Sequence, residues 1–455
     1  MPFITFIPGL ICIIVLLRGR TQDAFLNVLL PVLLLIPVDY YLTIQPIPPM
    51  NMVDSVLLPL GIGMALRDLN RWQFTRSDVW LALYIFSFGY ADYQAGHLYA
   101  AILRWFTTLH TGLVPYMAGK LLIEQGGIRI KTVQRFISLV FIASIFSMYE
   151  YVMKSNPYQY FWSHFYPGQW PGWVTAIRWG FGRVAGPYSQ SELAGIIVLA
   201  SLVMAMWLGH RRYRSREVIA SSTNPLKHAK LITFVLLVTL GMTQARGPWI
   251  GTVVALPIAW IGLARFPKRR ALLVFTLGFA LGVPAYFAAK DYASGKRTDY
   301  GSEKETAQYR AQLLDHYIPI AQLGGPWGWG PLGFPRVDGQ ISIDNEYLFV
   351  YLAQGYMGLI AWVLLLFETI LALFRQGFKT KSPRDRHFIF SLLGIVFGLS
   401  FVLSTVFLGS QSYEVMFLII GWSQSIHAVT KVRTLPKRAE SQCLLNEPAR
   451  MRVYT

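Results

Sequence analysis

Long apolar stretches, separated by short polar connections, recur along most of the chain. About twelve or thirteen of them approach the roughly 20 mostly apolar residues that a helix needs to cross a lipid bilayer. Because the stretches are continuous rather than alternating in polarity, they predict helices and not barrel strands. The predicted spans are residues 3–18, 24–42, 50–67, 78–92, 98–125, 133–152, 191–209, 229–245, 247–264, 271–289, 346–374, 387–408 and 411–429.

Composition supports this reading of the pattern. Hydrophobic residues make up 54% of the chain and the mean hydropathy is +0.41, more than an ordinary soluble domain tolerates. We therefore predict an all-α, polytopic integral membrane protein. Its start lacks a basic region and a small-residue cleavage site, so we expect the first segment to be retained. The predicted parts are membrane helices in 1–152, 191–289 and 346–429, long loops at 153–190 and 290–345, and a basic tail at 430–455.

The placement of the basic residues relates the net charge of +18 to membrane topology and not to nucleic-acid binding. If residue 18 faces the cytoplasm, most Lys and Arg fall on cytoplasmic connections or on the tail, as the positive-inside rule requires. The short connections on the other side, 43–49, 90–97 and 409–411, contain none. The basic connections then contact anionic lipid headgroups, and both long loops and the active site lie outside the cytoplasm, with the C-terminus inside.

The first long loop is rich in aromatic residues. They form either an interfacial belt at headgroup depth or flat apolar platforms for sugar rings or a polyprenyl chain. The two interpretations are compatible with each other. The residues are Tyr158, Tyr160, Phe161, Trp162, Phe165, Tyr166, Trp170 and Trp173.

Several arginines lie on the predicted outer side, where the charge bias should have removed them, and four of these are candidate site residues. Arg178 and Arg183 precede the seventh span, Arg246 lies at a tight turn between the eighth and ninth, and Arg310 lies in the second long loop. Guanidinium groups offer permanently charged, bidentate donors to phosphate, so we predict that they bind the phosphates of a lipid-linked substrate. Alternatively, they pair with local carboxylates such as Glu192, Asp299 or Glu303, or reach lipid phosphates.

A polar tetrapeptide, Asp344-Asn345-Glu346-Tyr347, ends the second long loop. Its carboxylates could orient or deprotonate an attacking hydroxyl. The same residues also suit an ordinary helix start, with an Asp or Asn cap and an acid in the first turn. A metal site made from Asp338, Asp344 and Glu346 is a third alternative with oxygen ligands. The histidines do not have a spacing typical of metal ligands. We expect no disulfide between Cys12 and Cys443, because they lie in the first apolar span and in the cytoplasmic tail.

These motifs, in this order, resemble the bacterial O-antigen ligase and Wzy-type polysaccharide polymerase superfamily. The resemblance covers roughly residues 178–365 and implies a GT-C-like fold. The similar segments are the Arg183 stretch, Gln244-Ala245-Arg246-Gly247, Arg310 followed by Gly328-Trp329-Gly330, Asp344-Asn345-Glu346-Tyr347-Leu348, and Gly355-Tyr356-Met357-Gly358-Leu359. Lipopolysaccharide ligases carry a histidine directly before the asparagine, where this chain has Asp344. The resemblance therefore favours a polymerase of cell-surface polysaccharide.

The resemblance implies a multi-pass protein of the bacterial inner membrane that transfers glycan from an undecaprenyl-pyrophosphate-linked donor to a lipid-linked glycan acceptor. Arg246 would act in catalysis, Arg178, Arg183 and Arg310 would bind the pyrophosphate, and Asp344 or Glu346 would handle the acceptor proton. Asn345 and Tyr347 would position substrate. No metal or other cofactor is implied. The implied partners are the lipid-linked oligosaccharide, membrane lipids, and a flippase and a chain-length regulator of the same pathway, without nucleic acid.

Two other functions stay open at this point. Ligation of finished glycan to a lipid or protein acceptor uses the same chemistry and differs only in its product. A transporter or flippase is a different class, and such proteins usually carry ionisable groups at the membrane midplane on broken helices related by repeats. Here the deep basic residues are Arg104 and Lys120, and the sequence shows no repeat.

Overall fold

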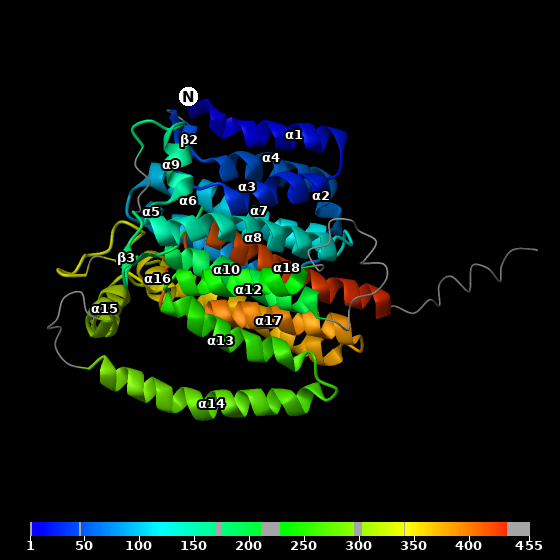
Figure 1. The fold of residues 1–455 in the computed structure, drawn as a ribbon. Coiled ribbons are helices and arrows are strands. Elements are labelled where there is room, and N and C mark those ends of the chain that lie inside the picture. Colours follow the sequence, from blue (N-terminus) through cyan, green and yellow to red (C-terminus); the bar gives the residue numbers. More distant parts are fainter. Residues whose placement is uncertain are drawn as a thin grey trace, which may run out of the picture.

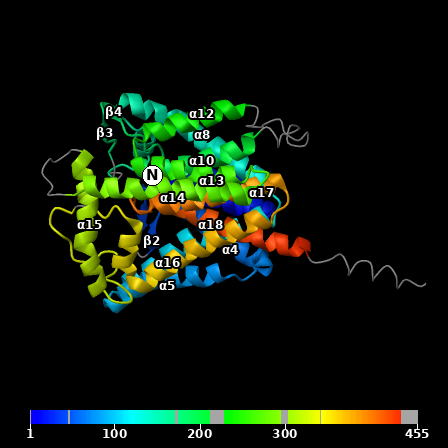
Figure 2. The same cartoon turned by 90° about the horizontal axis from the view of Figure 1, so that it is seen from below.

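The computed structural model describes residues 2–44, 47–169, 174–210, 228–294, 303–340 and 342–434. Most of its long helices run side by side as one bundle, and α15 lies across one end of that bundle (Figures 1 and 2). We call this end the α15 end. The basic connection 211–227, the tail from 435, and Trp170, Trp173 and Asp299 lie outside the described residues.

Helices dominate the chain, and the strands form two short antiparallel hairpins, β1–β2 and β3–β4. In chain order the elements are η1 Pro2–Phe6, α1 Ile7–Arg18, α2 Thr21–Ala24, η2 Phe25–Leu29, α3 Leu30–Leu35, β1 Leu42–Ile44, β2 Ile47–Met50, α4 Met52–Arg67, η3 Leu69–Arg71, α5 Arg76–Gln94, α6 Leu98–Thr108, η4 Leu109–Leu113, α7 Val114–Met117, η5 Ala118–Ile123, α8 Arg129–Met153, α9 Pro157–Ser163, β3 Ile177–Arg178, β4 Phe181–Gly182, α10 Ser191–Gly209, α12 Ala229–Met242, α13 Arg246–Ile261, α14 Pro267–Tyr292, α15 Glu303–Leu323, α16 Glu346–Lys379, α17 Pro383–Val402 and α18 Ser410–Thr434.

Every predicted apolar stretch contains helix, which confirms the all-α membrane fold class. Five helices in the described part of the chain, α8, α10, α14, α16 and α17, are long and apolar enough to cross a membrane. Shorter apolar helices lie at Phe3–Arg18, Thr21–Leu35 and Ala229–Met242.

The second apolar stretch is helical over a shorter range than predicted. Helix α3 ends at Leu35 rather than near residue 42, and Ile36 is already extended. The cause is Pro37, because a residue before proline is pushed out of the helical region. The chain then turns through the β1–β2 hairpin before α4 begins.

Helices α13 and α17 pack closely through small residues. A Cβ added to Gly398 would lie 2.6 Å from the carbonyl oxygen of Gly251, and one added to Gly394 would lie 2.5 Å from that of Ala255. Small residues let membrane helices approach backbone to backbone, where dispersion contacts and not water exclusion hold them together. This contact fixes the start of α13 beside the end of α17 at the α15 end.

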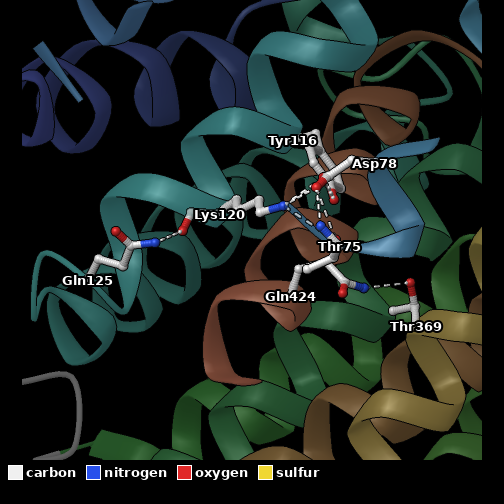
Figure 3. A network of polar contacts seen from close by, with 7 residues as sticks. All are labelled: Thr75, Asp78, Tyr116, Lys120, Gln125, Thr369 and Gln424. Atoms are coloured by element: carbon white, nitrogen blue, oxygen red, sulfur yellow. Dashed lines mark hydrogen bonds and ion pairs between the residues drawn. The ribbon is translucent and has the colours of Figure 1, made fainter. Parts of the chain in front are cut away.

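Lys120, one of the two deep basic residues in the sequence, forms a buried ion pair near the opposite end of the bundle (Figure 3). Its Nζ lies 2.6 and 2.7 Å from the carboxylate oxygens of Asp78 and 4.3 Å from the ring centroid of Trp72. The hydroxyl of Tyr116 donates to the same carboxylate at 2.6 Å. The charge is therefore neutralised inside the protein and serves the packing of α5 against η5. The other deep basic residue, Arg104, pairs with Asp92 at 3.5 Å.

The glycine-rich loop after α15 docks into a break in α16. At Gly355 the backbone has φ 66° and ψ −168°, so the helix is interrupted there. The amide of Trp329 donates to the carbonyl of Leu352 at 2.9 Å, and the amide of Gly330 donates to that of Ala353 at 3.0 Å. A Cβ on Gly328 would lie 2.4 Å from the amide nitrogen of Gly355. The loop thus replaces hydrogen bonds that α16 loses, and it fixes the chain that leads on to residue 346.

Candidate active site

A cavity of about 320 Å³ lies at the α15 end, between α15, the first turns of α10 and α16, and the connection from α17 to α18. We call it the arginine cavity. Its polar lining is Gln190, Glu192, Arg310, Arg336, Gln340, Ser342, Asp344 and Thr405. Its apolar lining is Tyr317, Pro331, Phe334, Ile343, Phe349, Val406 and Phe407.

Two guanidinium groups line this cavity. Arg310 lies on α15, and Arg336 lies on the segment that follows the glycine-rich loop. Neither forms an ion pair with a carboxylate among the residues that the structure describes, and Nε of Arg310 is buried without a hydrogen-bond partner there. A buried donor without an acceptor is costly, so an anionic ligand in the cavity would stabilise this arrangement.

Arg183 reaches the cavity through Glu192. The guanidinium lies 2.5 Å from Oε1 of Glu192, in the first turn of α10, and Glu192 lines the cavity. The local carboxylate considered as an alternative for Arg183 is therefore present. Nε of Arg183 is buried and has no partner in the described part of the chain. An incoming phosphate would compete with Glu192 for this cation.

A buried carboxylate holds the loop that carries Arg183. Oε2 of Glu150, at the end of α8, accepts hydrogen bonds from the amides of Ala185 and Gly186 at 3.0 and 2.8 Å. Gly186 has φ 62°, and a Cβ there would lie 2.5 Å from Oγ of Ser147. Glycine is therefore required at this close approach. One signal in the sequence could have identified Glu150, an acid in the apolar C-terminal half of α8.

Arg178 and Arg246 lie at the margin of the cavity rather than on its wall. Nη1 of Arg178 donates to the carbonyl of Gln244 at 3.0 Å. Arg246 is the first residue of α13 and is half-buried. A Cβ on the next residue, Gly247, would lie 2.8 Å from Oγ1 of Thr405, which lines the cavity. The four predicted arginines thus lie at the same end of the bundle, and of these Arg310 lines the cavity directly.

Asp344 is the member of the acidic tetrapeptide that lines the arginine cavity. It accepts a hydrogen bond from Oγ of Ser342 at 2.8 Å. Since Arg310 and Arg336 line the same cavity, its carboxylate lies where both an anionic donor and an acceptor hydroxyl could approach.

The next three residues have structural contacts. Oδ1 of Asn345 caps α16 by accepting from the amide of Leu348 at 3.0 Å. Glu346 is 2% exposed, and its Oε2 accepts from the amide of Leu408 at 2.8 Å. The hydroxyl of Tyr347 donates to the carbonyl of Ser400 at 2.8 Å. None of the three lines the arginine cavity, and their predicted roles in substrate handling stay predictions.

A second cavity, of about 640 Å³, adjoins the first. We call it the carboxylate cavity because Asp54, Glu346 and Glu414 line it. Phe349 and Phe407 line both cavities, with their rings edge to face and their centroids 4.8 Å apart. These two rings form the wall between the cavities. Glu414, Asp54 and Arg336 were not recognised from the sequence, because their spacing carries no motif.

The metal alternative built on Asp338, Asp344 and Glu346 has no matching geometry in the described residues, which contain no group of three or more side chains able to hold a metal ion. Asp344 and Glu346 line different cavities.

One comparison with known proteins finds a family match over part of the chain. Residues 231–363 match the family model described as O-antigen ligase. The matched segment runs from α12 into α16 and includes Arg246, Arg310, Arg336, Asp344 and the Gly355 break. No curated protein matches the chain. The match confirms the resemblance drawn from the motifs and supports glycan transfer as the type of reaction.

Proposed function

We propose that the protein is a polymerase of a cell-surface polysaccharide, because residues 231–363 match the family model described as O-antigen ligase. The donor is a glycan linked to undecaprenyl pyrophosphate, and the acceptor is another lipid-linked glycan. The reaction takes place at the α15 end, which faces away from the cytoplasm in the inner membrane of a bacterium. A flippase supplies the donor, and a chain-length regulator acts on the product.

The observation that carries this proposal is the arginine cavity. It is lined by Arg310 and Arg336, which form no ion pair within the part of the chain that the structure describes, by the Glu192 carboxylate that bonds Arg183, and by the Asp344 carboxylate. A pyrophosphate needs several fixed donors, and guanidinium groups supply them without losing their charge. An acceptor hydroxyl needs a carboxylate within reach. Both requirements are met in one cavity at one end of the helix bundle.

The proposed step is a displacement at the anomeric carbon of the donor sugar. The acceptor oxygen forms the new bond to this carbon, while the bond from the carbon to the pyrophosphate oxygen breaks. The electron pair leaves with the polyprenyl pyrophosphate, whose growing charge Arg310, Arg336 and Arg183 stabilise. The hydroxyl proton passes to Asp344. No nucleotide, metal ion or covalent intermediate takes part, since the pyrophosphate already activates the sugar.

Ligation of finished glycan is the rival within the same chemistry. The residue before Asn345 favours a polymerase, because the ligases have histidine at this position and this chain has Asp344. The products separate the two functions. A polymerase makes a ladder of repeat lengths from a single lipid-linked unit, whereas a ligase attaches glycan to a different acceptor and leaves its length unchanged.

The test uses purified protein in lipid nanodiscs with an undecaprenyl-pyrophosphate-linked oligosaccharide. We expect the wild-type protein to produce a ladder, and Arg246→Ala and Arg310→Ala to abolish chain extension. The matched control is Arg71→Ala, which removes an exposed guanidinium, paired with Asp68, at the opposite end of the bundle. It should leave the ladder intact. Normal polymer length in Arg310→Ala, with the protein folded, would reject the proposal.

A further inference from the structure

The carboxylate cavity is enclosed by elements that lie far apart in the sequence. Its lining comes from α4, α5, α6, η4, the start of α16 and the first turn of α18. The aromatic rings of Tyr84, Phe88 and Tyr413, together with Phe349 and Phe407, form part of its apolar surface. At about 640 Å³ it can hold one or two sugar rings.

Glu414 is the polar group in this cavity that the protein leaves unsatisfied. Its residue exposure is 5%, and its Oε2 is buried without a hydrogen-bond partner among the described residues. Buried polar atoms are nearly always hydrogen-bonded, and an orphaned acceptor costs about 1–3 kcal/mol or more when it is charged. A ligand that donates a hydrogen bond to this oxygen would remove that cost.

The other acidic groups of the cavity already have contacts within the protein. Oδ1 of Asp54 lies 2.9 Å from Nε2 of His110, and its Oδ2 accepts from the amide of Asn51 at 2.9 Å. Oε2 of Glu346 accepts from the amide of Leu408. These contacts hold two of the three carboxylates that surround the space. Among the described residues, Oε2 of Glu414 is the buried carboxylate oxygen of this lining that has no hydrogen-bond partner.

The lining selects the chemistry of the ligand. Both basic residues of the lining already contact carboxylates, His110 at Asp54 and Arg104 at Asp92, so among the described residues neither is free to bind an anionic ligand. Hydroxyl groups donate to carboxylates, and aromatic faces accept the apolar faces of sugar rings. An uncharged, hydroxyl-rich ring therefore fits both features of the wall.

We infer that the carboxylate cavity binds an uncharged sugar unit of the acceptor glycan, with one sugar hydroxyl donating to Oε2 of Glu414. This inference rests on the proposed function. The donor pyrophosphate occupies the arginine cavity, and the acceptor reaches it across the wall formed by Phe349 and Phe407. Donor and acceptor glycans thus have separate sites, so a change in one cavity should alter the affinity for one substrate only.

The test needs two substrates with separate roles. The acceptor is a neutral oligosaccharide on an alkyl chain without phosphate, and the donor is the undecaprenyl-pyrophosphate-linked unit with its accepting hydroxyl blocked. We expect Glu414→Leu to raise the acceptor KM about tenfold, because the side chain keeps a similar size but can no longer accept the sugar hydroxyl, and to leave the donor KM within about twofold. An unchanged acceptor KM, or an equal rise in both constants, overturns the inference.

A second variant fills the cavity without touching its buried groups. Leu332 lines the carboxylate cavity and is 85% exposed, so Leu332→Trp should be tolerated by the fold. It should also raise the acceptor KM and spare the donor KM. The matched control is Leu281→Trp on α14, where Leu281 is 72% exposed and lines neither cavity. It should change neither constant.

A binding experiment can show whether the sugar site exists independently of whether the proposed function is correct. The alkyl oligosaccharide carries a photoreactive diazirine, and mass spectrometry locates the cross-link on the wild-type protein. Cross-links at carboxylate-cavity residues such as Phe88 or Leu103 support the sugar site even if no glycan is transferred, in which case the proposed function fails alone. Cross-links confined to the arginine cavity or to the lipid-facing surface overturn the sugar site.

Discussion

Gly328→Ala tests how the glycine-rich loop docks on α16. Gly328 has φ 76°, and a Cβ there would meet backbone atoms of Ala353, Gln354 and Gly355, the nearest at 2.4 Å. Backbone atoms cannot move aside as a flexible side chain can. The loop must therefore shift away from the break in α16.

The cost has two parts. A non-glycine residue at positive φ costs about 1–2 kcal/mol. The shift also weakens the hydrogen bonds from Trp329 to Leu352 and from Gly330 to Ala353, which are 2.9 and 3.0 Å long. At about 0.5–1.5 kcal/mol each, they add roughly 1–3 kcal/mol to the cost of docking.

Gly325→Ala is the matched control. Gly325 lies in the same loop with φ 64°, and a Cβ there meets nothing within 4 Å. It carries the backbone cost but not the contact cost. Hydrogen exchange at the amides of Trp329 and Gly330 measures loop opening directly. We expect exchange in Gly328→Ala to be about 5- to 150-fold faster than in Gly325→Ala. Equal exchange in the two variants would refute the docking argument.

Three further changes test other parts of the structure. Lys120→Met should destabilise the protein by about 3–5 kcal/mol, because Asp78 is left as a buried unpaired charge, and adding Asp78→Asn should recover part of the loss; thermal unfolding in detergent checks both, and additive losses would contradict the pairing. Glu150→Gln should raise the donor KM without unfolding the protein, because the loop that carries Arg183 loses a charged acceptor worth about 1.5–3 kcal/mol; an unchanged KM would contradict this role. Arg336→Ala should raise the donor KM about tenfold or more, because a charge-assisted contact to phosphate is lost. Steady-state kinetics at varied donor concentration measure this constant, and an unchanged donor KM would contradict the contact.

Much of the fold could be predicted from the sequence because lipid imposes a simple rule. Each span needs a continuous apolar run, and helices form over every run that was predicted. The end of the second span was predicted near residue 42, because the hydropathy stays high through Ile36 and Val38. Helix α3 ends at Leu35 instead, because Pro37 pushes the residue before it out of the helical conformation. At this position the conformational effect of proline, and not the hydropathy pattern, determined where the helix ends.

Only those site residues could be predicted whose residue type is itself unusual at its place in the sequence. Arginines outside the expected charge bias pointed to the α15 end, and Arg310 lines the arginine cavity. Asp344 was selected by its place before a helix. Glu414 lies inside an apolar helix, and its unsatisfied oxygen exists only because α4, α5, α16 and α18 meet around it. Such a property arises from tertiary packing and leaves no spacing in the sequence.

The central claim is that the arginine cavity binds the donor pyrophosphate and promotes its departure. The most direct measurement counts the undecaprenyl pyrophosphate released and the glycosidic bonds formed in one reaction, with wild-type protein and with Arg310→Gln. We predict one pyrophosphate carrier released for each bond formed by the wild type, and loss of both products together in Arg310→Gln. Equal rates of both in the variant, or glycan extension without release of the carrier, would contradict the account.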